Sequence, residues 1–324
     1  MLSLLTSVPA LGQEVTLRLF SDGGPASPYG AGAAAFAEEV TRRTGGRYRI
    51  EPVLGLQAVG QVLGPNRAVG RGLLDAVRSG EADLSIMSAA PLGTYAPSVL
   101  MLDVPFLFRD AQHARAVLDG SVGQELLAQL PEPGGVIGLA WSETGVRHLT
   151  NNQRPVRGPD DLKGLTIRVQ ENEVHQQAFR ALGANVVAMP LGQLQAAIEQ
   201  GTVNGQENPL WVLMLTRLPQ VQKHLSLTGH VYNAGIVVMS KSAHERLSPN
   251  DRNAFVEAAQ SAALATRRKI DELEANGLTQ LRNSGLEIIE EVDRGAFQRA
   301  LQPLTLEWRR RFGAELIDRI QAAK

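Results

Sequence analysis

The sequence contains no cysteine among its 324 residues. This absence excludes disulfides, cysteine-ligated zinc sites and thiolate nucleophiles. A surplus of charge is missing too, because 32 Lys and Arg residues are balanced by 33 Asp and Glu residues, which leaves a formal net charge of −1. We therefore do not expect a nucleic acid as a partner. No apolar run reaches the roughly 18 residues of a membrane-spanning helix, so we do not expect the chain to span a membrane.

The common enzyme signatures are also missing. The sequence has no G-x-S-x-G, H-E-x-x-H or G-x-x-x-x-G-K-[ST] pattern, and its six histidines are dispersed without metal-ligand spacing. "GAGAAA" (residues 30–35) fits a relaxed dinucleotide fingerprint, but the fingerprint needs its glycines directly after a strand. Here eight residues separate Gly30 from the strand that ends at Ser21. We therefore expect no cofactor and no metal.

The first residues resemble the end of a secretory signal. "MLSLLTSVPALGQE" is apolar at first and then carries Ala10-Leu11-Gly12, small residues at the spacing of a signal-peptidase site. We predict that residues 1–13 are a signal-peptide remnant and that the mature chain begins near Gln13. The alternative is an ordinary N-terminus in front of the first strand.

Strand-like and helix-like segments alternate along the rest of the chain. "EVTLRLFS" and "YRIEPV" are typical of strands, and an Ala-rich helix pattern that ends at Gly45-Gly46 lies between them. Residues 249–284 form one long helix pattern that begins with Ser248-Pro249, a good cap with proline in the first turn. This alternation predicts an α/β fold with largely parallel sheets. Because no linker divides the chain, we expect it to cross between two domains more than once.

Three polar residues near strand ends suggest a ligand site. Arg168 lies on the opposite face of its strand from Ile167 and Val169, Arg147 follows another strand, and Asn208 ends an extended segment before a proline. A guanidinium group matches a carboxylate with two parallel hydrogen bonds, so two arginines and an amide in one cleft would suit a carboxylate ligand. Alternatively, each arginine pairs with an internal acid; those considered are Asp160, Asp161 and Glu171.

Four segments together resemble the substrate-binding proteins of TRAP (tripartite ATP-independent periplasmic) transporters. They are "FAEEVTRRTGGRYRIEPV", "YAPSVLMLDVPFLFRDAQHARAVLDG", "RPVRGPDDLKGLTIRVQ" and "GANVVAMPLGQLQAAIEQGTVNGQENP". The resemblance implies that Arg168 grips the ligand carboxylate, and that Arg147 and Asn208 are also ligand-binding residues. The segment 63–84 is longer and richer in Gly and Arg than is usual in the family, so the identity of the acid is most open there.

The resemblance also implies a two-lobed periplasmic binding protein fold, with a ligand cleft between the lobes and a long helix across both. Domain I would comprise residues 14–145 plus 233–273, and domain II residues 146–232 plus 274–324. The implied protein is periplasmic, is not an enzyme, and is expected to be a monomer. It would capture a dicarboxylate, sugar acid or related carboxylate and deliver it to TRAP membrane subunits.

The far half of the ligand should meet the carboxyl ends of strands, where open α/β sheets bind ligands. We expect contacts from residues 21–29, in particular from Ser21, and from Ser88. Glu171, close to Arg168 in sequence, completes the expected site. A second hypothesis is a soluble α/β enzyme that acts on a carboxylate anchored by Arg147 and Arg168. Its candidate acid/base groups are Glu171, His175 and His230.

Overall fold

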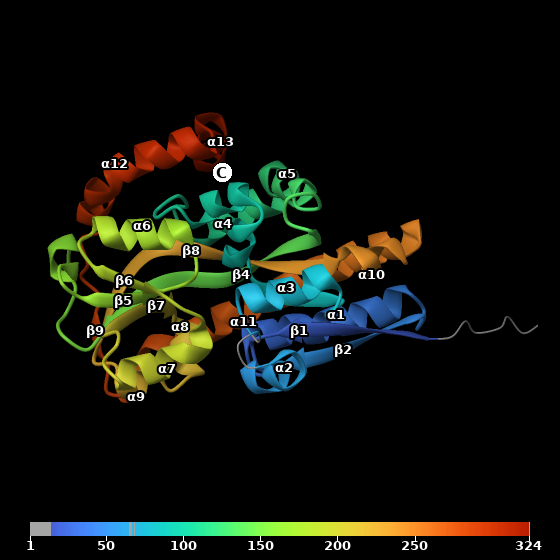
Figure 1. Ribbon diagram of the computed structural model, residues 1–324, viewed down its shortest axis with the longest axis horizontal. Helices are drawn as coiled ribbons and strands as arrows, with labels where there is room; N and C mark the ends of the chain where they lie inside the picture. The colour runs from blue at the N-terminus through green and yellow to red at the C-terminus, as the bar shows by residue number, and fades with distance from the viewer. Residues whose placement is uncertain (1–13, 65–66, 68, 324) are drawn as a thin grey trace, which may run out of the picture.

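The computed structural model describes residues 14–64, 67 and 69–323, so the expected signal remnant lies outside the described residues. Helices and strands alternate around one large mixed sheet, and the α/β prediction is confirmed (Figure 1). The strand order is β2-β1-β3-β8-β4-β7-β5-β6, with β9 beside β8. None of the helices within the described ranges is long and apolar enough to cross a membrane.

The strands are β1 (Val15–Ser21), β2 (Tyr48–Leu54), β3 (Leu84–Ser88), β4 (Val136–Asn151), β5 (Thr166–Val169), β6 (Asn185–Ala188), β7 (Gly205–Pro209), β8 (His224–Ser240) and β9 (Glu287–Ile289). The α-helices are α1 (Pro28–Arg43), α2 (Leu56–Leu63), α3 (Arg71–Ser79), α4 (Ala111–Asp119), α5 (Ser121–Gln129), α6 (Glu173–Ala181), α7 (Leu191–Glu199), α8 (Leu210–Met214), α9 (Leu218–Val221), α10 (Lys241–Glu245), α11 (Pro249–Asn283), α12 (Arg294–Phe312) and α13 (Ala314–Ala322). The 3-10 helices are η2 (Ala90–Thr94), η3 (Pro97–Asp103) and η4 (Pro159–Leu162).

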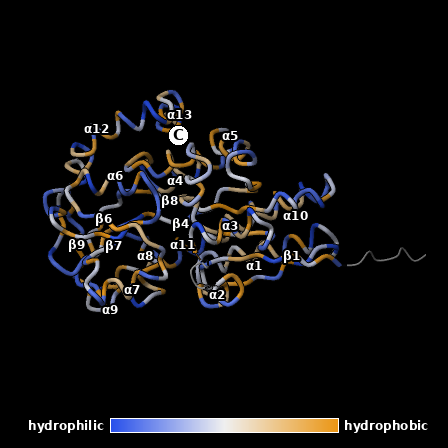
Figure 2. Tube along the Cα trace, viewed as in Figure 1, coloured by the Kyte–Doolittle hydropathy of each residue, from blue (hydrophilic) through white to orange (hydrophobic). Residues whose placement is uncertain are grey.

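The molecule has two lobes, each built on a group of parallel strands (Figure 1). In the first lobe β1 pairs in parallel with β2 and β3, and α1 covers them. In the second lobe β5 pairs in parallel with β6 and β7. Hydrophobic and hydrophilic residues alternate along outer helices such as α12, as expected of helices with one face toward a core (Figure 2).

The two longest strands, β4 and β8, pair antiparallel and pass from one lobe to the other. β3 of the first lobe pairs with β8 up to Gly235, whereas β7 of the second lobe pairs with β4 from Arg147 onward. The pairing of β4 with β8 shifts register between Glu143 and Gly145 and again after Arg147. The two strands therefore pass between the lobes near residues 144–147 and 230–234.

The long helix predicted over residues 249–284 is α11, and the Ser248 side chain caps it by accepting from the backbone N–H of Asp251. Phe255, near its start, packs edge-to-face on Phe36 of the first lobe, with ring centroids 5.8 Å apart. Gly277, near its end, lies against Met214 of the second lobe. The helix therefore contacts both lobes, as expected.

The C-terminal helices form another connection. In α12, Trp308 Nε1 donates to Gln177 Oε1 of α6 at 2.8 Å. In α13, Arg319 pairs with Glu125 of α5 at 2.9 Å, and the Ile320 carbonyl lies 2.9 Å from His113 Nε2 of α4. The expected domain partition assigns residues 274–324 to the second domain, but α13 packs against helices assigned to the first. The domain boundaries stay a prediction.

Candidate functional site

A cavity of about 400 Å³ lies where strand ends of the two lobes face each other. This volume is within the usual range for small-molecule sites. Five of the six expected site residues line it, namely Arg168, Arg147, Asn208, Glu171 and Ser88. The first-lobe wall is made by Asp22, Gly23, Gly24, Pro25, Ala26, Ser27, Tyr29, Met87, Ala90 and Pro91, among others. The second-lobe wall includes Gln170, Met189, Pro190, Leu191, Trp211 and Val212.

Ser21 is the expected residue that the cavity lining does not include. It is the last residue of β1 and is fully buried, and its Oγ accepts from the Gly23 backbone N–H at 3.3 Å. Side chains alternate along a strand, so the inward orientation of Ser21 turns the next residue toward the cleft. That next residue is Asp22, which does line the cavity and which the sequence argument did not single out.

Arg168 reaches the cavity from β5, and only 2 % of its surface is exposed. Its Nε and Nη2 both donate to the Met189 carbonyl, at 2.9 and 2.6 Å. Among the residues that the structure describes, no carboxylate lies within ion-pair distance of Arg168. Burial lowers the pKa of Arg168 to about 10, so the side chain stays charged at neutral pH. A buried charge without a counter-ion is costly, and this one faces the cavity.

Arg147, in contrast, already has a counter-ion inside the protein. Its Nη2 donates to Glu207 Oε1 at 2.9 Å, and its Nε contacts the other oxygen of the same carboxylate. Both side chains are almost completely buried. The possibility of an internal acid therefore holds for Arg147, although the partner is Glu207 of β7 rather than Asp160, Asp161 or Glu171. The arginine also donates to Asn208 Oδ1 and to Asn233 Oδ1, each at 3.1 Å.

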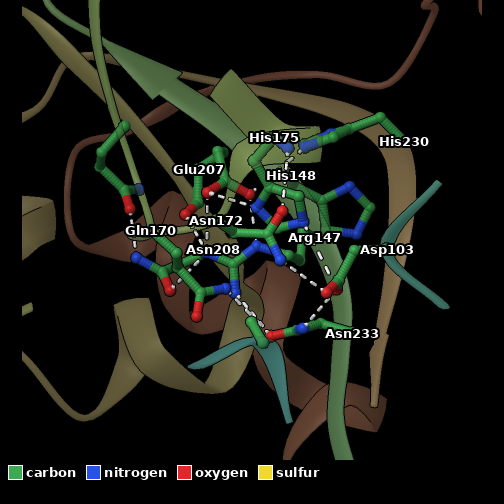
Figure 3. Close-up of polar contacts among 12 residues, drawn as sticks. Asp103, Arg147, His148, Gln170, Asn172, His175, Glu207, Asn208, His230 and Asn233 are labelled. Atoms are coloured by element: carbon green, nitrogen blue, oxygen red, sulfur yellow. Dashed lines mark hydrogen bonds and ion pairs between the residues drawn. The ribbon is translucent and has the colours of Figure 1, made fainter. Parts of the chain in front are cut away.

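The Arg147–Glu207 pair belongs to a buried polar network (Figure 3). Asp103 accepts from Asn172 Nδ2 at 2.8 Å and from Asn233 Nδ2 at 2.9 Å. His175 lies between two carboxylates, with Nε2 3.5 Å from Asp103 Oδ1 and Nδ1 3.8 Å from Glu207 Oε1. The network thus joins residues of both lobes beneath the cavity.

Charge is balanced within this network. Burial alone would lower the pKa of His175, but the carboxylates of Asp103 and Glu207 raise it to about 9, so the ring is cationic at neutral pH. Burial would raise the pKa of Glu207, but Arg147 and His175 hold it well below its usual range. Two cations therefore face two carboxylates. Arg168 remains the cation of the cavity wall whose charge is not matched by a carboxylate in the described part of the chain.

The expected acid/base groups do not form a catalytic arrangement. His175 and His230 lie outside the lining of the cavity, and only Glu171 borders it. His230 Nδ1 lies 2.7 Å from Thr228 Oγ1, and burial lowers its pKa. These positions argue against the enzyme hypothesis. Over residues 14–64, 67 and 69–323, no group of three or more His, Asp and Glu is placed to hold a metal ion.

Contacts across the cavity hold the two lobes together. Tyr29 packs edge-to-face on Trp211, with ring centroids 5.6 Å apart, and its hydroxyl lies 2.7 Å from Thr144 Oγ1. Trp211 Nε1 donates to the Thr144 carbonyl. Ser88, at the end of β3 as expected, donates through Oγ to Gln170 Oε1 of the second lobe at 3.4 Å. These aromatic contacts were missed by the sequence argument, because no local pattern links residues so far apart.

Comparisons with known proteins agree with this geometry. The family described as DctP, bacterial extracellular solute-binding protein, family 7, matches residues 21–311. A solute-binding protein of Verminephrobacter eiseniae is 39 % identical over 313 residues, which cover 96 % of this chain and 90 % of that protein. The 2,3-diketo-L-gulonate-binding periplasmic protein of Escherichia coli is 38 % identical over 229 residues, which cover 71 % of this chain and 70 % of that protein.

A solved structure is similar over nearly its whole length. It is a TRAP periplasmic solute-binding protein from Polaromonas sp. JS666 bound to D-erythronate. The TM-score is 0.90 and the sequence identity 40 %, and the match covers 96 % of this chain and 99 % of the other.

Proposed function

The chain belongs to the bacterial extracellular solute-binding proteins of family 7, and we propose that it captures a small organic acid in the cleft between its lobes and delivers it to TRAP membrane subunits. The E. coli relative is named as a periplasmic binding protein for 2,3-diketo-L-gulonate, and the Polaromonas structure holds D-erythronate. Both molecules carry a carboxylate. The compartment of action is the periplasm.

The observation that carries this proposal is the state of Arg168. Its guanidinium is buried, faces the cavity and has no carboxylate within ion-pair distance in the described ranges. A ligand carboxylate can supply the missing charge, and the planar guanidinium can give it two parallel hydrogen bonds. Asn208 borders the same cavity, and its amide suits a further ligand oxygen. Arg147 acts mainly by holding Glu207 and Asn208 in position.

Binding is coupled to closure of the lobes in this proposal. Among the strands that the structure describes, the crossing segments of β4 and β8 pair there only with each other, and their register shifts at Gly145. Gly145 has a φ of +118°, a backbone conformation that L side chains rarely adopt. A hinge at this point would let the second lobe rotate away from the first-lobe wall to admit the ligand and rotate back to enclose it against Arg168.

The test is a thermal-shift screen with a panel of carboxylates that includes D-erythronate, D-galactonate and 2,3-diketo-L-gulonate. A ligand present at 100 times its Kd should add about 2.7 kcal/mol to the free energy of unfolding and so raise the melting temperature. Mass spectrometry of the same mixtures should find the acids unchanged. Stabilisation by none of the carboxylates would contradict the proposal, and turnover of one of them would favour the enzyme hypothesis.

A further inference from the structure

The first-lobe wall of the cavity carries a carboxyl group that the proposed function has not yet used. Asp22 follows β1 and lines the cavity. Its Oδ1 is shielded from solvent and has no hydrogen-bond partner among the residues described. Buried polar atoms are nearly always hydrogen-bonded, so an unpartnered oxygen at a ligand cavity calls for a donor.

The groups around Asp22 do not supply that donor. The Tyr29 hydroxyl is engaged with Thr144 Oγ1 at 2.7 Å, and the Ser27 hydroxyl donates to the Gly24 carbonyl at 2.7 Å. Arg71 follows the cavity residue Gly70, but it is not part of the lining, and its Nε lies 3.7 Å from Asp75 Oδ2. Among the described residues none of these groups donates to Asp22 Oδ1, so a ligand hydroxyl group would be a fitting donor.

Charge along the cavity is correspondingly uneven. The second-lobe wall offers Arg168, whereas the first-lobe wall offers the carboxyl group of Asp22, and Glu171 lies at the border. Arg147 adds no net attraction for anions because Glu207 matches its charge. A ligand with one carboxylate can place it on Arg168 and direct neutral groups toward Asp22. A second carboxylate at the far end would meet a like charge instead of a cation.

We propose, building on the proposed function, that Asp22 accepts hydrogen bonds from ligand hydroxyl groups and that the cleft therefore selects hydroxylated monocarboxylic acids over dicarboxylic acids. A hydroxyl group is the fitting donor because an ionised carboxyl group only accepts. Hydrogen bonds to charged groups are stronger than neutral ones, and removing the donor leaves the buried acceptor unpaired. Asp22 thus favours one ligand class and repels the other.

Two matched ligand pairs test this selection. D-erythronate and meso-tartrate differ only at the terminal carbon, which is a CH₂OH group in the first and a carboxylate in the second. D-galactonate and galactarate differ in the same way. We expect calorimetric titration of the unmodified protein at neutral pH to give at least tenfold tighter binding of the monocarboxylate in whichever pair has the accepted length. Equal or tighter binding of the diacid would overturn the inference and leave the proposed function standing.

The variant Asp22→Asn tests whether Asp22 causes the preference for the monocarboxylate. The amide retains the shape but loses the charge, so the preference for the monocarboxylate over its diacid partner should shrink by roughly tenfold to a hundredfold. Asp160→Asn is the control, because it removes the same charge from an aspartate whose side chain is 87 % exposed and which does not line the cavity. An unchanged preference in Asp22→Asn would refute the role of Asp22.

The ratio of the affinities for a monocarboxylate and its diacid partner is measured on the wild-type protein. It therefore decides the question of selectivity even if Asp22→Asn does not fold. Butyrate, which has four carbons and no hydroxyl group, should bind Asp22→Asn as it binds the wild type, because it donates nothing to Asp22. If a folded wild-type protein bound none of these acids, the proposed function itself would fail and the inference with it.

Discussion

Replacing Arg168 should separate affinity from stability. Arg168→Ala removes the guanidinium that faces the cavity and, within the described ranges, donates only to the Met189 carbonyl. Truncating one partner of a buried, hydrogen-bonded charge pair costs about 2–5 kcal/mol of binding free energy. At about 1.4 kcal/mol per decade, affinity should fall roughly 30-fold to several thousand-fold. Arg168→Lys should restore little, because an ammonium group lacks the planar fork.

The empty protein should respond in the opposite direction. Burial lowers the pKa of Arg168 from its ordinary value to about 10, which means that folding disfavours its charged form. This cost to the stability of the folded protein is fully present below pH 10. It disappears above the pKa that Arg168 has in the unfolded chain. At 1.36 kcal/mol per pKa unit it is on the order of 3 kcal/mol at neutral pH. Arg168→Met, which keeps an apolar stem without the charge, should therefore raise the melting temperature of the empty protein.

Calorimetric titration with a stabilising acid and melting curves on Arg168→Ala, Arg168→Lys and Arg168→Met together decide the matter. The expected result is large losses of affinity with no loss of stability in Arg168→Met. A variant that melts early and still binds normally would refute the reasoning. It would mean that Arg168 has a structural partner and does not hold the ligand.

Further predictions concern other parts of the same site. Arg147→Met should lower the free energy of unfolding by about 3–5 kcal/mol, because it leaves Glu207 buried without its cation; a denaturant titration that detects no loss would contradict the pairing. Asp22→Asn should stabilise the empty protein at neutral pH by about 1–3 kcal/mol, because burial raises the pKa of Asp22 from 3.8 to about 6 and the cost of burying the charged carboxylate is complete above pH 6. This gain in stability should vanish below pH 3.8. A melting temperature that did not rise at neutral pH would count against the prediction. Between pH 6.5 and 9 the protein should lose stability, because the charged His175 ring stabilises the fold below pH 6.5 and this contribution is lost as the pH rises through 9. His175→Gln should flatten the pH profile of the melting temperature. An unaltered profile would be inconsistent with a cationic ring. Saturating ligand should reduce the radius of gyration measured by small-angle scattering through closure at Gly145, and an unchanged radius with binding established would argue against the hinge.

Local patterns in the sequence were enough to predict much of the fold. Alternating strand and helix patterns predicted the α/β architecture, and Ser248-Pro249 marked the start of α11. The period of two in β5 predicted that Arg168 lies on the opposite face from Ile167. These features depend on neighbours in sequence or on strand length.

The parts that escaped prediction depend on tertiary pairing. Arg147 meets Glu207 because β4 and β7 lie side by side and antiparallel, a pairing that no spacing in the sequence encodes. Ser21 was expected at the cavity and does end β1, but its side chain is buried, and the next residue, Asp22, lines the cavity instead. The contact of α13 with α5 likewise depends on the turn at Gly313, where φ is +95°.

The number of links between the lobes limits the way in which they can move. β4, β8, α11 and the α12–α13 pair each run from one lobe to the other (Figure 1). Two bodies joined at one point can turn freely in every direction, whereas several links fixed at different points remove most of that freedom. Opening and closing of the cleft should therefore follow a single path of relative lobe motion. A membrane partner that contacts both lobes would then meet one reproducible surface each time the cleft closes.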